Sequence, residues 1–363
     1  MTLEGVLDGD LDTAVEGAEL QLEGYRGELT GYCYRMLGSL ADAEDAVQDA
    51  MVRAWRHSGS LRDASAQRGW LYRIATRVCF DHLEGRRRRA LPVDMSPSPS
   101  APVLSSLGPQ VEAAAWVEPA PDARVLGTAP AADPAAVAEE RESVRLALVA
   151  ALQLLPPRQR AVLVLREVLH WHADEVARLL GTSVPSVNSL LQRARATLAA
   201  RDAQQAAVEP LDEQHAALLA QYVDAFERYD VDALVGLLHA EATMSMPPYA
   251  LWLRGPRDVA AWLLGPGAGC RGSRVLRTRL NGQLALAQYR PDLASAGPGG
   301  QPTRWTPWAL VVLAVRQDDD EPRIGDLVFF LDAGRGLFER CGLPTELGGE
   351  LGADLSRESG PVG

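Results

Sequence analysis

Apolar residues recur three and four positions apart over residues 155–198, the spacing that gives an α-helix one buried face. The pattern predicts three helices. The first follows two consecutive prolines, which favour a helix start, and the second, over residues 174–180, ends before Gly181, where a left-handed backbone costs little. The third opens with Ser183 as its N-cap. A short helix, a tight turn and a longer helix are typical of a helix-turn-helix.

The outer face of the third helix carries side chains that suit DNA. Arg can form two hydrogen bonds with guanine, Asn and Gln can pair with adenine, and a helix fits the major groove. A solvated helix in an ordinary bundle is the alternative, but no acidic residue occurs between Val176 and Arg201. The candidate DNA contacts are Pro185, Ser186, Asn188, Ser189, Gln192, Arg193 and Arg195.

Two helices are expected near the start of the chain. An apolar stripe over residues 29–37 ends at Gly38, and Asp42 is expected to cap the next helix. The outer face of this second helix is acidic and amidic, which suits a protein partner rich in Arg and Lys and does not suit DNA. That face consists of Glu44, Asp45, Gln48, Asp49 and Arg53.

A third helix is predicted over residues 70–84. It exposes Arg73 and Arg77 and leads into four consecutive Arg residues, 86–89, a run that either binds phosphate or is solvated. We expect Trp70, at the start of this helix, to be a core residue.

From residue 211 onward the pattern changes. Alternating polar and apolar positions predict strands, and Asn281-Gly282 between two of them is a hairpin-turn signal. Helices followed by an antiparallel, curved sheet make an α+β domain. The predicted helices cover residues 211–229, 231–239 and 256–264, and the predicted strands cover 242–246, 251–254, 275–280, 283–288, 308–315 and 324–331.

The expected fold class is therefore multidomain, with two all-α domains followed by an α+β domain. The segment 91–138 is rich in Pro, Ser and Ala, a composition that predicts a flexible or polyproline-like linker, and a loose acidic leader precedes residue 19. The expected domains are residues 19–90, 139–201 and 211–345, followed by a disordered tail at 346–363.

The net charge of −12 looks wrong for a DNA-binding protein until it is divided along the chain. Residues 53–90 contain 10 Arg against 3 acidic residues, and residues 139–201 contain 9 Arg against 6. Local charge, more than net charge, governs contact with phosphates. Both basic blocks coincide with helices that we expect to bind DNA.

The four cysteines, Cys33, Cys79, Cys270 and Cys341, are far apart and form no Cys/His cluster. We expect buried thiols in a reducing compartment, no metal site and no cofactor. The chain has no hydrophobic signal core, and its longest apolar run, residues 308–315, is too short to span a bilayer. The protein is expected to be cytoplasmic.

Two segments carry a family resemblance. GYCYRMLGSLADAEDAVQDAMVRAWRH, followed by GWLYRIATRVCFDHLEGRRRR, resembles region 2 of bacterial sigma-70-type factors of the extracytoplasmic-function group, and the helix-turn-helix resembles their region 4. Both occur in the family's order. The resemblance implies a sigma factor that binds core RNA polymerase and promoter DNA and carries no catalytic chemistry of its own.

The resemblance also implies roles for individual residues. The acidic helix would dock on the largest polymerase subunit through Glu44, Asp45, Gln48, Asp49 and Arg53, and the helix-turn-helix face would read the minus-thirty-five element as duplex. The following basic helix would melt and hold the minus-ten element, whose single-stranded bases need cations and stacking surfaces. The candidates for that contact are Tyr72, Arg73, Arg77, Asp81, Arg86, Arg87, Arg88 and Arg89.

The C-terminal part resembles the SnoaL-like, NTF2-type cone domain attached to this sigma subgroup, on the stretches MPPYALWLRGPRDVAAWL and LVFFLDAGRGLFERCGLP. Within the linker, the WVEP sequence that begins at Trp116 resembles the subgroup's WxEP motif, which would either enter the polymerase cleft or dock on that domain. We expect the domain to modulate activity in cis. Five polar residues are candidates for a pocket, although their spacing does not force them together: His239, Glu241, Tyr249, Arg254 and Asp332.

Two other functions are alternatives to the interpretation as a sigma factor. One is a one-component regulator, in which the C-terminal domain senses a ligand and the helix-turn-helix binds an operator. The other is a SnoaL-like isomerase or cyclase fused to a DNA-binding module. A polymerase-docking helix favours the sigma factor, because an ordinary repressor has no use for one. The sequence leaves open an anti-sigma partner and a small-molecule ligand of the C-terminal domain.

Overall fold

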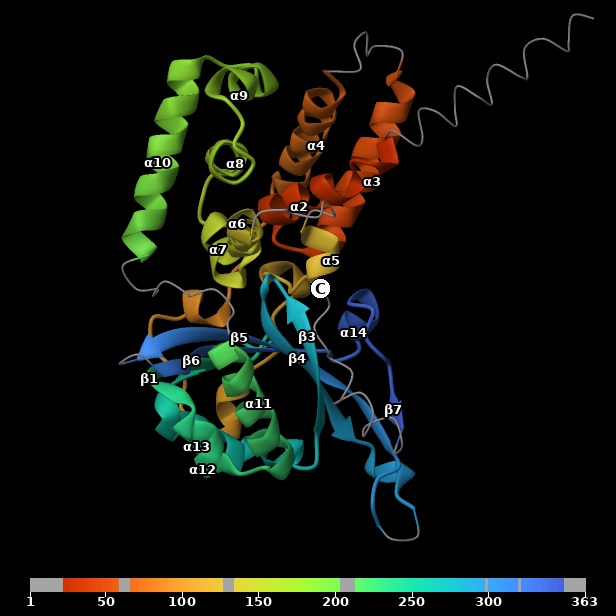
Figure 1. The fold of residues 1–363 in the computed structure, drawn as a ribbon, viewed down its shortest axis with the longest axis vertical. Coiled ribbons are helices and arrows are strands. Elements are labelled where there is room, and N and C mark those ends of the chain that lie inside the picture. The colour runs from red at the N-terminus through yellow and green to blue at the C-terminus, as the bar shows by residue number, and fades with distance from the viewer. Residues whose placement is uncertain are drawn as a thin grey trace, which may run out of the picture. The chain divides into compact units, whose positions relative to one another are not determined.

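The computed structural model describes residues 22–58, 66–126, 134–202, 213–297, 300–318 and 321–348. The chain forms two units whose division does not follow chain order (Figure 1). Unit 1 consists of the residues up to Arg88 together with Asp122–Ala203, and unit 2 consists of Arg89–Pro121 together with the residues from Gln204 onward. The expected leader before residue 19 and residues 349–363 of the expected tail lie outside the described residues.

The described elements of unit 1 are all helical. The first three helices pack on one another, and the last three form the predicted helix-turn-helix, whose first helix continues into a wider helical turn, η6. The elements are α2 (Arg26–Leu37), α3 (Leu40–Arg56), α4 (Gln67–Leu83), α5 (Asp122–Val125), α6 (Pro134–Val144), α7 (Leu146–Leu152), α8 (Pro157–Leu163), η6 (Val164–Val168), α9 (Ala173–Leu180) and α10 (Val184–Asp202).

Local signals set several helix ends as the sequence predicts. Gly38 and Gly181 both adopt left-handed backbone conformations directly after α2 and α9, with φ of 71° and 61°. The Oγ atom of Ser183 accepts a hydrogen bond from the Ser186 backbone N–H at 3.4 Å, so Ser183 caps α10. The expectation for Asp42 is wrong, because Ser39 caps α3 and accepts a hydrogen bond from the Asp42 N–H.

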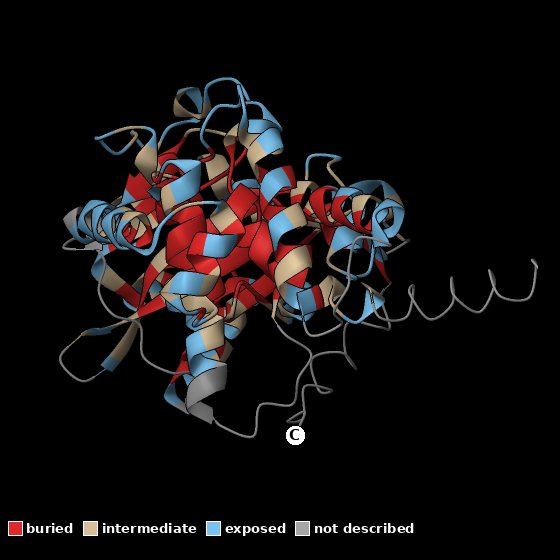
Figure 2. Cartoon of the chain, turned by 90° about the horizontal axis from the view of Figure 1, so that it is seen from above, coloured by how far each residue is buried: buried red, intermediate tan, exposed pale blue. Residues whose placement is uncertain are grey.

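The inward faces of α2, α3 and α4 form the interior of unit 1. Figure 2 shows buried residues of the chain in red. Tyr32 of α2 is fully buried, and its hydroxyl lies 2.8 Å from that of Thr76 on α4. Burial of each large apolar side chain stabilises the folded unit by roughly 1.5–3 kcal/mol. Other fully buried members of this core are Leu29, Met36, Ala46, Leu71 and Val78.

Unit 2 confirms the predicted α+β fold. Its sheet has the strand order β2-β1-β6-β5-β4-β3, with β7 paired to β5, and every pair is antiparallel except β1 with β6. The strands are β1 (Leu238–Ser245), β2 (Trp252–Arg254), β3 (Arg274–Leu280), β4 (Gln283–Pro291), β5 (Arg304–Asp318), β6 (Glu321–Leu331) and β7 (Leu347–Gly348).

The turn between β3 and β4 follows directly from the sequence. Asn281 and Gly282 both have positive φ, 57° and 68°, and the flanking residues Leu280 and Gln283 pair with each other. A two-residue turn of this kind matches the twist of the strands that it joins. The hairpin signal is therefore confirmed.

Helices pack against the sheet and bury most of the apolar residues of unit 2. The shared core includes Phe226 of α11, Trp262 of α13 and Phe329 of β6. The helical elements from the C-terminal part are α11 (Glu213–Arg228), α12 (Val231–Gly236), α13 (Gly255–Leu264), η7 (Pro266–Cys270), η8 (Leu293–Ser295) and α14 (Leu337–Arg340). Because α12 ends at Gly236, His239 lies in β1 and not at a helix end as predicted.

Residues 89–121, which we call the strap, differ from the flexible linker that their composition predicts. The strap contains three single turns, η3 (Pro92–Asp94), η4 (Leu104–Leu107) and η5 (Ala113–Ala115), and belongs to unit 2. Trp116 is fully buried, and the Ala120 N–H donates to Asn281 Oδ1 at 2.9 Å. Burial of this large aromatic side chain offsets part of the entropy that the Pro- and Ser-rich chain loses on docking.

The WVEP sequence is the main anchor of the strap. Glu118 forms an ion pair with Arg335, at 3.1 Å, and their side chains are only 10% and 16% exposed. Of the two expected placements for this motif, docking on the C-terminal domain is the one seen in the structure.

Candidate nucleic-acid and protein interfaces

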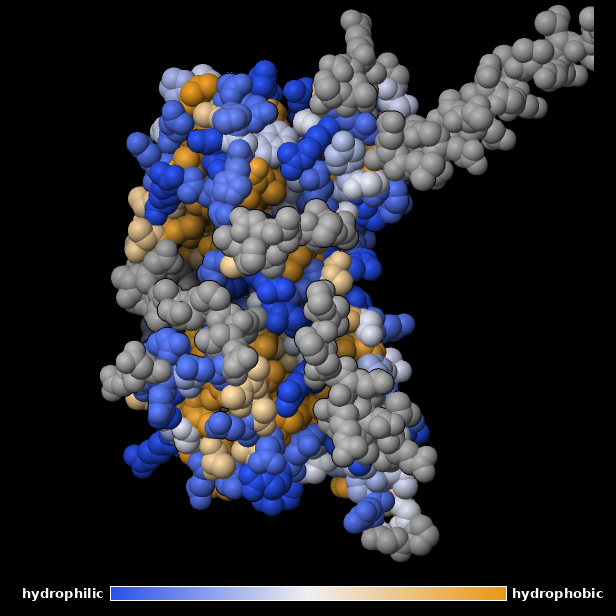
Figure 3. Space-filling model, in the orientation of Figure 1, coloured by the Kyte–Doolittle hydropathy of each residue, from blue (hydrophilic) through white to orange (hydrophobic). Residues whose placement is uncertain are grey.

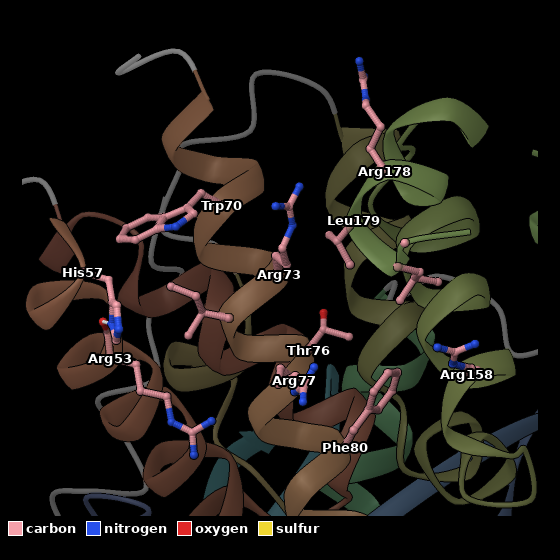
Figure 4. A pocket seen from close by; sticks show the side chains of 13 residues that line it. Arg53, His57, Trp70, Arg73, Thr76, Arg77, Phe80, Arg158, Arg178 and Leu179 are labelled. Carbon is pink, nitrogen blue, oxygen red and sulfur yellow. Dashed lines mark hydrogen bonds between the residues drawn. The ribbon is translucent and has the colours of Figure 1, made fainter. Parts of the chain in front are cut away.

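A basic groove of about 610 Å³ runs along α4 in unit 1 (Figure 4). Phe80 projects from α4 toward Arg158 of α8, while Arg73 and Thr76 lie on the side of α4 that faces Leu179 of α9. The groove is lined by Arg53, His57, Trp70, Arg73, Ile74, Thr76, Arg77, Phe80, Arg158, Arg178, Leu179, Leu180 and Gly181.

The cations of this groove differ in how far they are neutralised. Arg53 pairs with Asp81 at 3.1 Å, and Arg178 pairs with Asp174 at 3.0 Å. Arg73 and Arg77 are exposed and have no carboxylate partner among the described residues. Unpaired guanidinium groups beside an apolar wall suit a nucleic-acid strand, whose phosphates need cations and whose bases need flat surfaces.

The structure revises two predictions about aromatic residues of α4. Trp70 is partly exposed and lines the groove, so it is not the core residue that we expected. Tyr72, a predicted minus-ten contact, is fully buried, with its ring 5.1 Å from that of Tyr32 and 5.0 Å from that of Trp171. Burial raises the pKa of the Tyr72 hydroxyl. A side chain packed on both sides cannot stack on a base, so this prediction is wrong.

The four consecutive Arg residues have different environments. Arg86 pairs with Asp42 at 2.8 Å, while Arg87 and Arg88 are exposed. Arg89 is nearly buried in unit 2 and donates hydrogen bonds to the carbonyl oxygens of Trp116, at 2.7 Å, and Ala113. The prediction that Arg89 contacts DNA is therefore wrong, because its donors are occupied within the strap.

The outer face of α3 is partly committed to contacts within unit 1. Asp45, Gln48 and Asp49 are exposed, as predicted for a docking face. Glu44, by contrast, pairs with Arg124 of α5. The remaining predicted member of the face, Arg53, pairs with Asp81 as described above.

Two apolar residues on this helix were not predicted to be exposed. Trp55 is 53% exposed and Val52 is 37% exposed, although tryptophan is usually well buried. Both follow the polar face at helical spacing, Val52 three residues after Asp49 and Trp55 three residues later. An exposed aromatic beside acidic side chains is typical of a protein-binding surface. Their three-residue spacing from Asp49 places them on the polar face of the helix, and this spacing could have predicted their exposure.

The predicted DNA-reading face of α10 is open to solvent. Its side chains at Asn188, Ser189, Gln192, Arg193 and Arg195 are exposed, as is Pro185, while Ser186 is partly buried. Arg195 pairs with Glu167 at 2.7 Å, whereas Arg193 folds back and donates to the Ser189 carbonyl oxygen at 3.3 Å. Figure 3 shows hydrophilic residues (blue) over much of the visible surface. Val184, the first residue of α10, is an apolar side chain that is also 38% exposed.

Buried arginines connect the first three helices to the helix-turn-helix within unit 1. Arg35 of α2 donates to the backbone oxygen and the hydroxyl of Ser143, at 3.2 and 2.6 Å. Arg160 of α8 donates to the Met36 carbonyl oxygen, to Gln153 Oε1 at 2.6 Å and to the Leu155 carbonyl oxygen at 3.1 Å. We call Arg35 and Arg160 the arginine bolts.

Both arginine bolts remain charged at neutral pH. Burial lowers the pKa of Arg35 and of Arg160 to about 10, well above 7. A buried charge is tolerated only where hydrogen-bond partners replace its lost water. The carbonyl acceptors therefore have to stay in place, which couples the positions of α2 and α8.

Comparisons with known proteins agree with the order of these elements. Residues 22–89 match the family Sigma-70 region 2, and residues 145–198 match the family Sigma-70, region 4. The ECF RNA polymerase sigma factor SigG of Mycobacterium tuberculosis is 44% identical over 332 residues, which covers 90% of this chain and 83% of that protein. The sigma factor SigJ of the same organism is 28% identical over 274 residues, covering 73% of this chain and 78% of SigJ.

The crystal structure of Mycobacterium tuberculosis SigJ has the same fold. It aligns with a TM-score of 0.54 at 23% sequence identity and covers 92% of this chain and 99% of that one. In the part of the chain that the structure describes, no helix is long and apolar enough to cross a membrane.

The arginine bolts give a direct stability prediction. Arg160→Met should lower the free energy of unfolding by roughly 1–3 kcal/mol, because it leaves buried carbonyl groups without a donor. The matched control is Arg158→Met on the same helix, where the side chain is exposed. It should change stability by less than about 0.5 kcal/mol. Urea unfolding of the full chain, followed by helical circular dichroism, measures both. Equal effects of the two substitutions would contradict the role of Arg160.

Proposed function

The chain belongs to the extracytoplasmic-function sigma factors of the sigma-70 family, so it binds core RNA polymerase and directs transcription initiation at promoters, and we propose how its surfaces divide this work. The observation that carries the assignment is the match to SigG over most of that protein's length, with regions 2 and 4 in order. Run-off transcription with core polymerase is the corresponding experiment. We propose that the chain acts in the cytoplasm, where its partners are.

The outer face of α3 is the proposed polymerase-docking surface. It combines the exposed acidic and amidic side chains of Asp45, Gln48 and Asp49 with the exposed ring of Trp55. The polar groups would steer association with a basic partner, and the tryptophan would supply the buried anchor. Glu44 and Arg53 contribute once their ion pairs within unit 1 are exchanged for polymerase contacts.

Trp55→Ala should weaken binding to core polymerase by roughly 2 kcal/mol, or about 30-fold, as expected for an aromatic anchor at an interface. Asp49→Ala should have a smaller effect that fades as salt screens the charge. Competition with labelled wild-type chain for core polymerase measures both. Leu293→Ala, an exposed apolar residue of unit 2, is the control and should bind normally. Wild-type affinity of the Trp55 variant would place the docking surface elsewhere.

The α4 groove is the proposed minus-ten surface. Arg73 and Arg77 supply unpaired positive charge, and Trp70 supplies a partly exposed ring on which a flipped base can stack. The basic surface continues past the end of α4 with Arg86, Arg87 and Arg88. Near that end of the helix, the ion pair with Asp81 holds the Arg53 side chain in position. Tyr72 and Arg89 are left out of the proposed minus-ten surface, because both side chains are buried.

The exposed face of α10 is the proposed minus-thirty-five reader. Asn188, Gln192 and Arg193 can reach base edges, while Ser186 and Ser189 are short enough to let the helix approach the backbone. Arg195 is held by Glu167 and is better placed for phosphate than for a base.

Arg193→Ala should cost roughly 1–3 kcal/mol of affinity for the minus-thirty-five element and relax base preference at one position. Arg195→Ala is the matched control and should weaken all sequences alike, with a shallower salt dependence. Fluorescence anisotropy with a set of single-base variants of the promoter measures both. A uniform loss for the Arg193 variant would assign that residue to phosphate.

Unit 1 has to open for both promoter elements to be bound at once. The α4 groove is lined by residues of α9, so the two DNA-binding regions lie side by side in unit 1. On B-DNA the two elements are about 25 base pairs apart, roughly 85 Å at about 3.4 Å per base pair. We propose that polymerase binding separates region 4 from region 2 by breaking the contacts of the arginine bolts.

Unit 2 is proposed to act in cis and not as an enzyme. Of the five candidate polar residues, Tyr249 alone lines the cavity of about 200 Å³ in the described part of this unit. Asp332 accepts a hydrogen bond from the Leu337 N–H at 2.8 Å, and His239 Nδ1 accepts one from the Glu241 N–H, so both have structural partners. Control would pass through the strap, which joins the two sigma regions and packs in unit 2.

Arg335→Met should loosen the strap, because it removes the ion pair between Glu118 and Arg335 from a largely buried site. We expect faster proteolysis within residues 89–121 and a change of at least about twofold in run-off transcription, equivalent to roughly 0.4 kcal/mol. Arg257→Met removes the same charge from an exposed position and should alter neither. A loosened strap with unchanged transcription would exclude control through this segment.

A further inference from the structure

Unit 2 contains a cavity of about 200 Å³ on the helix-covered face of its sheet. Most of its wall is apolar and much of it aromatic, with Phe226, Trp262, Trp308 and Phe329 among the lining residues. Neither polymerase binding nor DNA reading uses this space. A concave, mostly apolar cavity with a few convergent polar groups is the usual form of a small-molecule site.

The polar part of the wall is dominated by Arg290 at the end of β4. Its Nε atom donates to the Gly269 carbonyl oxygen at 2.8 Å, and its guanidinium lies 4.1 Å from the ring centroid of Trp308. Among the described residues, no carboxylate pairs with Arg290 and its two Nη atoms have no hydrogen-bond acceptor. A Cβ atom at position 269 would lie 2.4 Å from Nη2, so glycine there makes room for the guanidinium.

Arg290 is the one charged side chain among the described residues that line the cavity. Cys270 also lines the wall, but burial raises the pKa of its thiol, so it stays neutral at pH 7. Tyr249 Oη accepts a hydrogen bond from Gln110 Nε2 at 3.2 Å. A single guanidinium with free N–H groups matches one carboxylate, whereas a doubly charged phosphate group would need more cations.

The strap forms part of the cavity wall. Leu104 and Leu107 of η4 line the cavity from outside the sheet, and Leu104 is still 66% exposed. The strap is anchored on both sides of this turn. The Ser100 N–H donates to the Trp252 carbonyl oxygen at 2.7 Å, and the Val111 N–H donates to the Pro248 carbonyl oxygen at 2.8 Å. The turn between the anchors can therefore move without release of the whole strap.

We propose that this cavity binds a compact aromatic carboxylic acid, with the ring between the aromatic walls and the carboxylate on Arg290, and that the strap closes over it. The size fits, because an apolar cavity of about 150 Å³ holds benzene, which leaves room here for one ring and a carboxylate. Planar carboxylate and guanidinium groups form two parallel hydrogen bonds. Bound ligand would bury more of Leu104 and Leu107 and hold the strap in place.

A ligand signal at this site would reach transcription through the strap, a step that rests on the proposed function. The strap leaves unit 1 at Arg88 and returns to it at Asp122. Ligand that stabilises the docked strap would thus act on the segment that joins region 2 to region 4. Ligand binding itself can be measured without polymerase, so failure of one claim is distinguishable from failure of the other.

The test uses the full chain and titration calorimetry with phenylacetate as the probe. We expect saturable binding with one site per chain, no binding of benzylamine or inorganic phosphate, and slower chymotrypsin cleavage at Leu104 and Leu107 when phenylacetate is bound. Arg290→Met should weaken phenylacetate binding at least about tenfold, or roughly 1.4 kcal/mol, while leaving the binding of neutral phenylacetamide unchanged. Arg257→Met is the matched control and should bind phenylacetate normally.

A second, conservative variant separates loss of the carboxylate contact from misfolding of the Arg290→Met chain. Arg290→Lys keeps the charge but loses the planar fork, and should give intermediate affinity. The proposal is overturned if the folded wild-type chain binds no phenylacetate at millimolar concentration, or if Arg290→Met binds it as tightly as wild type. Unchanged cleavage of the strap with phenylacetate bound would overturn the closing role of the strap.

Discussion

The hydrogen bonds of the arginine bolts are the constraint on which the arrangement of unit 1 depends. Arg35 and Arg160 give up water and regain partners far away in the sequence, at Ser143 and Met36 respectively. Such contacts add specificity more than net stability, because a buried charge tolerates only one arrangement of acceptors. They therefore hold regions 2 and 4 together in one defined geometry, which, in our proposal, is given up when polymerase and promoter bind.

The strap adds a second level to this constraint. The chain leaves unit 1 for the strap and returns to it, so the segment that has to lengthen the reach between regions 2 and 4 is packed in unit 2. Trp116 and the ion pair between Glu118 and Arg335 hold it there. The proposed control in cis would use this connection, since loosening or tightening the strap would change how freely region 4 can move.

Much of this could be predicted from sequence wherever the signal was local. The helix-turn-helix, the cap at Ser183 and the hairpin at Asn281 depend on residues a few positions apart, and all were predicted. Tyr72 and Arg89 were not, because exposure on a helix or in a charged run depends on what later packs against it. The strap has the composition of a flexible linker, and only the distant partners of its few anchoring residues reveal that it is docked.

The central claim is that the contacts of Arg35 and Arg160 hold regions 2 and 4 together in the free chain, and that the two regions separate when the chain binds polymerase. The most direct measurement is the distance between spin labels at Glu84→Cys and Ala196→Cys, both exposed sites in unit 1, with Cys270 and Cys341 changed to serine. The account predicts one short distance in the free chain and an increase of tens of ångströms in the complex with core polymerase and promoter. A long distance in the free chain, or an unchanged one in a complex that starts transcripts, would contradict it.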